Sequence, residues 1–231
     1  MTSITQSDDW PANTAMPKQE TLYILPMSCD RHPTDAIASL IYASAPALFN
    51  LMFGPKQWAI HRLSALIERP NNRFSHRHIR VAEVDHSAVG ASAVGVSAVG
   101  MIVMLPADQL KSTADYRDAF GLSQGLWLTL LQRLLLRHLL RHDYPAGSFY
   151  IGNLAVASDH RNRGIGHQLL SQCISEASPA EIFISVDVDN PRAQKLYESL
   201  GFQAVDTKTI RVLDTTIGSR ILSLNALGDV A

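Results

Sequence analysis

Two kinds of element alternate along the second half of the chain, and this alternation limits the fold more than any other feature. Apolar residues recur there with period two, as in a strand, or at about every 3.6 residues, as in a helix. The predicted order is strand, helix, strand, helix and two short strands, over residues 148–158, 164–177, 181–188, 191–200, 202–205 and 219–224. Pro191 lies in the first turn of the last helix, and Gly201 follows it as a C-cap. Strands that alternate with helices predict an α/β sheet with helices packed against it.

The first half of the chain has a looser version of the same pattern. Strands are predicted over residues 21–26, 76–84 and 101–105, and helices over residues 30–44, 56–68 and 126–142. The polar residues 106–121 between these elements predict a loop. The first 20 residues are polar and contain Pro11 and Pro17. We therefore expect a disordered tail over residues 1–20 and a single domain over residues 21–231.

The composition excludes several classes of partner. The 231 residues carry a formal net charge of −1, so no overall field attracts nucleic acid or an anionic membrane. The N-terminus lacks the basic and then apolar order of a signal peptide, and no stretch offers about 20 apolar residues for a membrane span. Cys29 and Cys173 lie far apart and predict reduced thiols. We expect a cytoplasmic protein.

Residues 87–100 repeat the tetrapeptide Ser-Ala-Val-Gly three times, with a period of five residues. A phosphate-binding Walker loop needs a lysine and a hydroxyl after its second glycine, but Ala, Val and Met follow these glycines, and Lys111 is the nearest lysine downstream. The dinucleotide fingerprint needs glycines two and three residues apart, which also disagrees. The repeat therefore predicts an elaborated hairpin turn or loop. Its two extra copies add ten residues, an even number that keeps the flanking strands in register.

The segment 161–166 has the spacing Arg-x-x-Gly-x-Gly and lies between a predicted strand and a predicted helix. Gly164 and Gly166 let the backbone approach a ligand closely. The first turn of a helix has unpaired N–H groups and a partial positive charge, so it can bind a pyrophosphate, and Arg161 and Arg163 add positive charge. On these six residues alone, an ordinary helix N-terminus with a solvated basic turn remains an alternative.

The next strand and helix add a second signature. Asn190 lies seven residues before Tyr197, and Gly201 and Phe202 close the helix. Together, LAVASDHRNRGIGHQLL and NPRAQKLYESLGF resemble the GNAT superfamily of acyl-CoA-dependent N-acetyltransferases, specifically over residues 149–205 and more loosely over residues 22–105. The resemblance implies a mixed, twisted sheet of about six to seven strands, flanked by helices, which splays where the cofactor enters.

The same resemblance implies how acetyl-CoA is bound, with no metal. The residues expected to contact its pyrophosphate are Arg161, Asn162, Arg163, Gly164, Ile165, Gly166 and His167. The pantetheine arm would pair with the backbone of Leu154, Ala155 and Val156, and one of these amides would polarise the thioester carbonyl. Asn190 would hydrogen-bond the same arm. Tyr197 would lie near the sulfur as the acid for the leaving thiolate, or would only pack the helix onto the sheet.

The general base is not settled by the sequence. Only a neutral amine attacks a thioester, so a base or a water chain must remove a proton. Ribosomal-protein acetyltransferases of this superfamily carry a glutamate five residues before the asparagine, where this chain has Ser185. This difference argues against that subclass. Asp187, Glu83 and Tyr150 remain candidates.

The sequence thus predicts an N-acetyltransferase that acts on a small-molecule or peptide amine, framed by the helices of residues 30–68 and by the insertion 106–147. The alternative is a non-catalytic acyl-CoA-binding sensor of the same fold. The leucine-rich helix around residues 126–140 is a core helix, a cover for the acceptor site or a homodimer contact. His138 and His142 are one helical turn apart, but no third ligand is evident, so no metal site is predicted.

Overall fold

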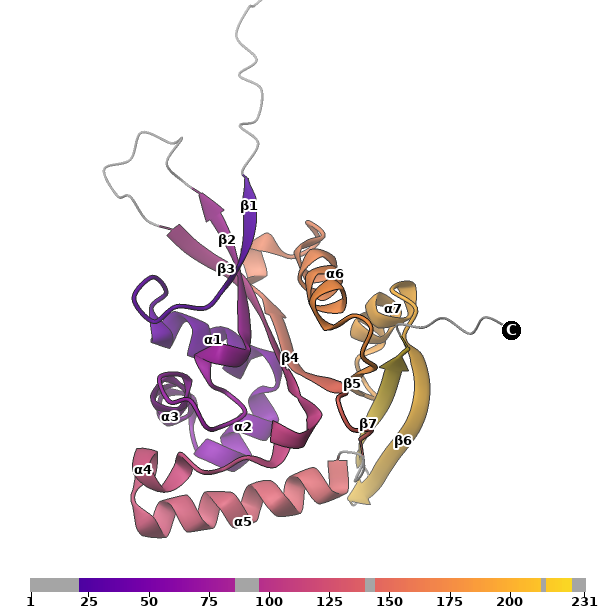
Figure 1. Cartoon of the computed structure of the whole chain (residues 1–231). Coiled ribbons are helices and arrows are strands. Elements are labelled where there is room, and N and C mark those ends of the chain that lie inside the picture. Colours follow the sequence, from indigo (N-terminus) through magenta and orange to yellow (C-terminus); the bar gives the residue numbers. More distant parts are fainter. Residues whose placement is uncertain (1–20, 86–95, 140–143, 213–214, 226–231) are drawn as a thin grey trace, which may run out of the picture.

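A seven-stranded mixed sheet organises the computed structural model, which describes residues 21–85, 96–139, 144–212 and 215–225 (Figure 1). The strands are β1 (Leu22–Pro26), β2 (Ile79–Asp85), β3 (Val96–Pro106), β4 (Phe149–Val156), β5 (Ile182–Asp187), β6 (Gln203–Val212) and β7 (Thr215–Leu224). Their order in the sheet is β1-β2-β3-β4-β5-β7-β6. The β4–β5 pair is parallel, and the other five pairs are antiparallel. The predicted fold class is confirmed.

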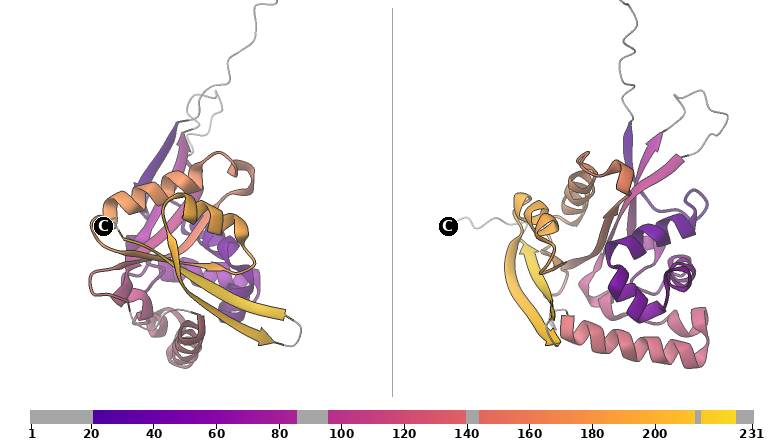
Figure 2. Two further views of the ribbon diagram at one scale, coloured as in Figure 1. Left: turned by 90° about the vertical axis from the view of Figure 1, so that its right-hand side faces the viewer. Right: turned by 180° about the vertical axis from the view of Figure 1, so that it is seen from behind.

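Helices cover both faces of the sheet (Figure 2). On one side lie α1 (Thr34–Ser44), α2 (Pro46–Phe53), α3 (Lys56–Ile67), α4 (Tyr116–Phe120) and α5 (Leu122–Leu139). On the other side lie α6 (Ile165–Ala177) and α7 (Pro191–Ser199). Three short 3-10 helices, η1 (His76–His78), η2 (Ala107–Lys111) and η3 (Ser158–His160), complete the described elements. No single described helix has both the length and the apolar content to cross a membrane, although α1 and α2, bent by 113° at their junction, meet both criteria as a pair.

Strand β3 shows how the two cores are separated. Met101, Val103 and Leu105 are buried against α1, α2 and α3, whereas Val99 and Ile102 are buried against α6. Residues 101 to 105 alternate with the period of two along a strand. Val99 faces α6 because Ala82 pairs with Gly100 and Glu83 with Ala98, which leaves Val99 as an extra residue on β3. Because both faces of β3 are buried, a shift of its register by one residue would exchange the two sets of side chains.

The parallel pair β4–β5 is short. It is limited to Phe149–Ile182, Tyr150–Phe183 and Ile151–Ile184, so the strands separate after Ile151. On its other edge, β4 has a register shift, because Val103 pairs with Asn153 and Met104 pairs with Ile151. Gly152 is therefore an extra residue on β4, and such a bulge bends a strand and increases its twist. The sheet opens at this point.

Several predicted boundaries are wrong. One predicted helix begins at Thr34 rather than at residue 30, after the N-cap Pro33, and α2 was not predicted. Residues 106–121 contain η2 and α4 rather than only a loop, because Leu110 and Tyr116 are buried in the core. Strands β6 and β7 have ten residues each, because they continue as a paired hairpin through polar residues such as Asp206, Thr207 and Lys208, which apolar periodicity does not reveal. Residues 1–20, predicted as a disordered tail, lie outside the described residues.

The third copy of the repeat is part of the sheet. Residues 96–100 belong to β3, where Ala98 pairs with Glu83 and Gly100 with Ala82. A Cβ on Gly100 would lie 3.2 Å from the Ala155 carbonyl oxygen and 3.3 Å from the side chains of Ile165 and Leu169. This glycine therefore lets α6 approach the sheet closely. The prediction of a turn or loop is wrong for this copy, and residues 86–95 lie outside the described residues.

Deletion of residues 91–100 tests what the two additional copies contribute. The first copy then replaces the third, so that Ser87 takes the place of Ser97 opposite Val84. Asp85 and His86 are left as a two-residue turn, and we expect a loss of about 1–2 kcal/mol in the free energy of unfolding, because this dipeptide lacks the glycine or asparagine that such turns favour. Urea unfolding monitored by circular dichroism measures it. A variant that does not fold would show that residues 86–95 contribute essential contacts.

Candidate functional site

Two neighbouring cavities lie where β4 and β5 separate. The outer cavity has a volume of about 450 Å³ and is enclosed by the end of β4, the turn before α6 and the start of α7. The inner cavity has a volume of about 200 Å³ and lies between α1, α2, β4, β5 and α7. Both are lined by Ser44, Leu154, Asn190, Ala193 and Leu196. These shared walls place the inner cavity directly behind the outer one.

The outer cavity brings together nearly all of the residues expected to hold the cofactor. The predicted residues that line it are Leu154, Ala155, Val156, Arg161, Asn162, Gly164, Ile165, Gly166, His167 and Asn190. Arg163 is the exception, because it is absent from this lining and its Nη2 donates to the Asp159 carbonyl oxygen at 3.1 Å. Arg192, on the first turn of α7, lines the cavity and was not predicted.

The glycine-rich turn has a left-handed backbone at two positions. Gly164, the N-cap of α6, has φ +78°, and Asn162 has φ +65°. The turn is held by Arg161 Nε, which donates to the Val156 carbonyl oxygen at 3.1 Å, and by Arg192, which donates to Asn162 Oδ1. No side chain caps the first turn of α6. Its N–H groups are therefore available to an anion, with the positive end of the helix dipole behind them.

The exposed edge of β4 forms a second wall of the outer cavity. Leu154, Ala155 and Val156 pair with β3 on one edge. Among the described strands, none pairs with their other edge, because the pairing with β5 ends at Ile151. Unpaired backbone groups on such an edge can pair with an extended ligand, as an added strand would.

Asn190 is the N-cap of α7. Its Oδ1 accepts a hydrogen bond from the Ala193 N–H at 3.1 Å, and Pro191 occupies the first turn. The oxygen of the amide is thus used in capping. The Nδ2 group carries two donors, which suit a carbonyl group of a bound ligand.

Tyr197 lines the inner cavity rather than the outer one, and its side chain is buried. Burial raises the pKa of its hydroxyl, with additional contributions from Tyr150 and the Asp187 carboxylate, so the phenol stays protonated at neutral pH. The ring also contacts Phe202, with a centroid distance of 6.2 Å. Tyr197 therefore combines a packing role with a protonated hydroxyl at the wall of the cavity.

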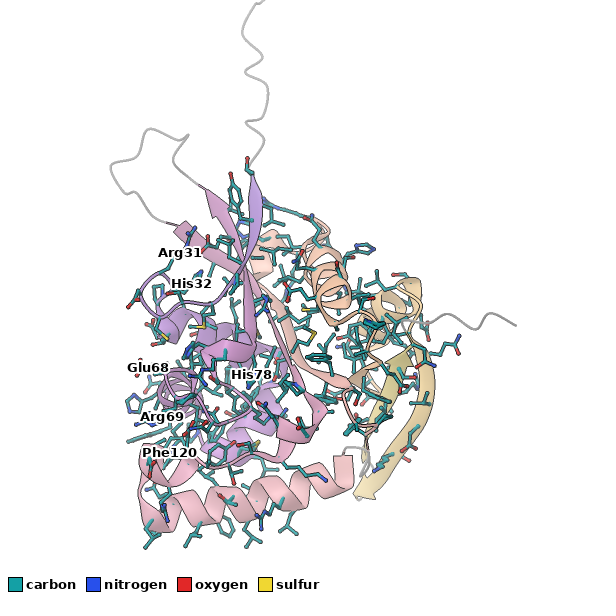
Figure 3. The ribbon with its side chains drawn as sticks, in the orientation of Figure 1. Arg31, His32, Glu68, Arg69, His78 and Phe120 are labelled. Atoms are coloured by element: carbon teal, nitrogen blue, oxygen red, sulfur yellow. The ribbon has the colours of Figure 1, made fainter. Side chains whose placement is uncertain are left out.

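Glu83, a candidate base in the sequence, contributes to neither cavity among the described lining residues. Its buried carboxylate accepts hydrogen bonds from Arg31 Nε at 2.9 Å and Nη2 at 2.5 Å, and it also contacts His32 Nε2. Arg31 and His32 lie on the loop between β1 and α1 (Figure 3). This cluster ties the loop to the sheet, so Glu83 has a structural role.

The other candidate bases lie together in the inner cavity. Ser185 and Asp187 both line it, as expected for residues two apart on β5. The Tyr150 hydroxyl and Ser185 Oγ are 2.6 Å apart and share a hydrogen bond. Partial burial raises the pKa of Asp187, and the nearby Asp189 carboxylate raises it further. Among the described lining residues, Asp187 supplies the carboxylate of this cavity.

The structure adds two polar residues that the sequence analysis missed. Asn153 is buried, and its Nδ2 donates to Ser44 Oγ at 2.8 Å, but its Oδ1 has no hydrogen-bond partner among the described residues. The guanidinium of Arg73, also buried, lies 5.0 Å from the ring centroid of Phe74. Asn153 was detectable as a polar residue within an apolar strand. Arg73 follows α3 in a polar segment without periodicity and gave no such signal.

The sheet opens between two parallel strands, and an uncapped glycine-rich helix start lies in the opening. This is the fold of the acetyltransferases that the chain resembles. The model of the acetyltransferase (GNAT) family matches residues 49–202, and the chain belongs to this family. The resemblance inferred from residues 149–205 is thereby confirmed.

Solved structures share the fold. A structure described as an acetyltransferase has a TM-score of 0.58 and 22% identity, over 88% of this chain and 99% of the other. The NatC complex bound to Gag peptide and CoA contains a chain with a TM-score of 0.53 and 18% identity, over 88% of this chain and 98% of the other. An uncharacterized protein of Mycobacterium leprae is 33% identical over 61 residues, which span 26% of this chain and only 17% of that protein.

The buried phenol of Tyr197 makes a prediction about alkaline stability. Its pKa is raised in the folded state, so above about pH 10, the ordinary tyrosine pKa, the unfolded state loses the proton first. The free energy of unfolding should then fall with pH, and Tyr197→Phe should make the fall shallower by about 1.4 kcal/mol per pH unit. Urea unfolding at intervals from pH 8 to about pH 11.5 measures the slopes. Equal slopes for the two proteins would show that Tyr197 ionises as readily in the folded state as in the unfolded state.

Proposed function

We propose that the protein is an N-acetyltransferase, which transfers the acetyl group of acetyl-CoA to a primary amine. The observation that carries the proposal is the arrangement of the two cavities. The outer one combines an uncapped helix start with an unpaired strand edge, and the inner one contains a carboxylate and a protonated phenol. The first pair of features suits a long anionic co-substrate, and the second suits proton transfer.

The residues of the outer cavity would each contact a different part of acetyl-CoA. The N–H groups of Gly164, Ile165, Gly166 and His167 would bind the pyrophosphate, with Arg161 and Arg192 adding positive charge. The edge of β4 at residues 154–156 would pair with the pantetheine arm. The Nδ2 group of Asn190 would donate to a carbonyl of this arm. The NatC neighbour, which has the same fold, is described as bound to CoA, and this supports CoA as the ligand of the outer cavity.

Asp187 would act as the base. The acceptor arrives as an ammonium ion with a pKa near 10.4, and it must lose a proton before its nitrogen can attack the thioester carbon. A carboxylate whose pKa is raised is a stronger base than an ordinary one, and Asp187 has this property. As the amide bond forms and the carbon–sulfur bond breaks, one β4 amide would stabilise the oxyanion.

Tyr197 would stabilise the leaving thiolate. Burial makes its phenol a weaker acid than the thiol that forms, whose pKa is near 8.5. Complete proton transfer from this phenol is therefore unfavourable, and its contribution is a hydrogen bond to the sulfur as negative charge develops there. Such a contribution lies at the low end of what an acid catalyst provides.

Gly164 and Gly147 offer a pair to test the cofactor site. Both have φ +78°, an added Cβ at either position meets no atom within 4 Å, and Gly147 lines neither cavity. Gly164→Ala and Gly147→Ala should each cost about 1–2 kcal/mol of stability. Only Gly164→Ala should weaken acetyl-CoA binding, by roughly 10-fold or more, because it disturbs N–H groups that would hold an anion. Isothermal titration calorimetry on both variants measures this. Equal affinities would exclude the turn as the pyrophosphate site.

Tyr197→Phe tests the proposed chemistry, once a screen of amino acids, polyamines, aminoglycosides and peptides has found an acceptor. We expect kcat to fall by roughly 10- to 100-fold, whereas the Kd of acetyl-CoA stays the same, because the variant loses one hydroxyl and keeps the ring. Tyr23→Phe, on the exposed face of β1, is the control and should retain full activity. Full kcat in Tyr197→Phe, with chemistry limiting, would leave Tyr197 only a packing role. Tight binding of acetyl-CoA without turnover of any amine would favour a non-catalytic sensor.

A further inference from the structure

Arg73 places an uncompensated positive charge in the wall of the inner cavity. Its side chain is 8% exposed, and a guanidinium stays charged at all physiological pH values. Among the described residues no carboxylate lies within ion-pair distance of it, and the guanidinium lies over the ring of Phe74. The Nη2 atom lies beside Gly152, only 3.4 Å from where a Cβ on that residue would be. A buried cation without a counter-ion is unfavourable, so this position calls for an anion that enters the cavity.

The same cavity contains the opposite charge, and the two charges do not pair. Asp187 lines the cavity with Arg73, and the Tyr150 hydroxyl lies within electrostatic range of both. The Arg73 guanidinium lowers the pKa of Tyr150, and the Asp187 carboxylate raises it, while burial raises it most. Because no ion pair joins Arg73 to Asp187, both remain available to a ligand.

Asn153 supplies an acceptor atom beside these charges. The side chain is 8% exposed and lines the inner cavity, and Oδ1 is buried without a hydrogen-bond partner among the described residues. Its Nδ2 group is already used, since it donates to Ser44 Oγ. An unsatisfied buried oxygen costs free energy, and an N–H donor from a ligand would remove that cost.

From these three residues we infer that the acceptor is an amino acid, whose carboxylate binds Arg73 and whose amine is held by Asn153 Oδ1 and Asp187. The inference rests on the proposed acetyl transfer. The cavity volume of about 200 Å³ lies below that of pockets for drug-sized ligands, roughly 300–1,000 Å³, which suits a small acceptor. Leu48, Phe49 and Met52 of α2 form an apolar wall, so an apolar side chain fits best.

The chemical step balances with the groups already present. The ammonium of the acceptor gives one proton to Asp187, and its nitrogen then forms a bond to the acetyl carbon. The carbon–sulfur bond breaks with its electron pair on sulfur. The nitrogen releases its second proton as the amide forms, and this proton converts the thiolate to the CoA thiol. The product is an N-acetylamino acid that has lost its positive charge and keeps its carboxylate. The cation at Arg73 therefore contributes to binding of both substrate and product.

The test compares each amino acid with the amine that lacks its carboxylate, such as leucine with isopentylamine and methionine with 3-(methylthio)propylamine. Release of the CoA thiol gives kcat/KM for each compound. The wild-type protein should prefer the amino acid by roughly 10- to 100-fold, the range expected for a hydrogen-bonded charge. Arg73→Gln should lose this preference, because kcat/KM should fall for leucine and should not fall for isopentylamine. Arg73→Lys, which keeps the positive charge, should restore part of it.

Arg77→Gln is the matched control, because it removes the same charge from an exposed position on η1, four residues away. It should keep the wild-type preference. The thermal midpoint and the acetyl-CoA affinity of each variant report whether a loss arises from folding or from the cofactor site. If Arg73→Gln does not fold, two measurements still test the inference. They are the wild-type ratio of kcat/KM for each amino acid and its amine, and the same ratio for Arg73→Lys.

Two results would overturn the inference while acetyl transfer itself stands. One is equal or greater kcat/KM for the amines without a carboxylate. The other is a clear preference for leucyl peptides with an amidated C-terminus, which would identify a peptide N-terminus as the acceptor. Binding of acetyl-CoA without acetylation of any compound would instead reject the proposed function, and the inference would fail with it.

Discussion

The end of the β4–β5 pairing, at Ile151, is the constraint on which the rest of the site depends. Gly152 follows as an extra residue in the β3–β4 register, and the resulting bend takes β4 away from β5. The opening leaves one edge of residues 154–156 unpaired and admits the first turns of α6 and α7. The absence of a side chain at Gly152 also leaves the space that the Arg73 guanidinium borders. One residue thus determines both the opening of the sheet and part of the polar wall of the inner cavity.

The parts of the site that the sequence predicted are those built from consecutive residues. The turn at residues 161–166 and the first residues of α6 form a local structure, and the N-cap Asn190 with Pro191 forms another. Their conformations depend on glycine, proline and capping side chains, which act over a few residues. Arg163 is the instructive exception. It fits the motif, but the direction of its side chain depends on the Asp159 carbonyl oxygen, which the spacing of residues does not reveal.

The inner cavity could not be predicted in the same way, because its residues come from distant segments. Arg73, Asn153 and Asp187 meet only after the sheet has formed and β4 has bent. Residue type alone did not distinguish the candidate bases Asp187, Glu83 and Tyr150. Tertiary contacts do distinguish them, because the Glu83 carboxylate is already bound to Arg31 and His32. The fold shows the same division. Strand and helix types followed from periodicity, whereas α2, α4 and the full lengths of β6 and β7 depend on packing and pairing partners distant in sequence.

The two charges of the inner cavity raise the question of why they do not neutralise each other. An ion pair between Arg73 and Asp187 would satisfy both groups and close the space between them. The ring of Tyr150 is packed against Tyr144 and its hydroxyl is fixed to Ser185 at 2.6 Å, so a rigid group stands within range of both charges. An unpaired buried charge such as that of Arg73 costs stability, and it persists only where the surrounding structure imposes it. A cavity held in this state has an electrostatic preference before any ligand arrives. On the proposed transfer to an amino acid, that preference would select a molecule with a carboxylate at one end and an amine at the other, and it would present the amine to the carboxylate that can deprotonate it.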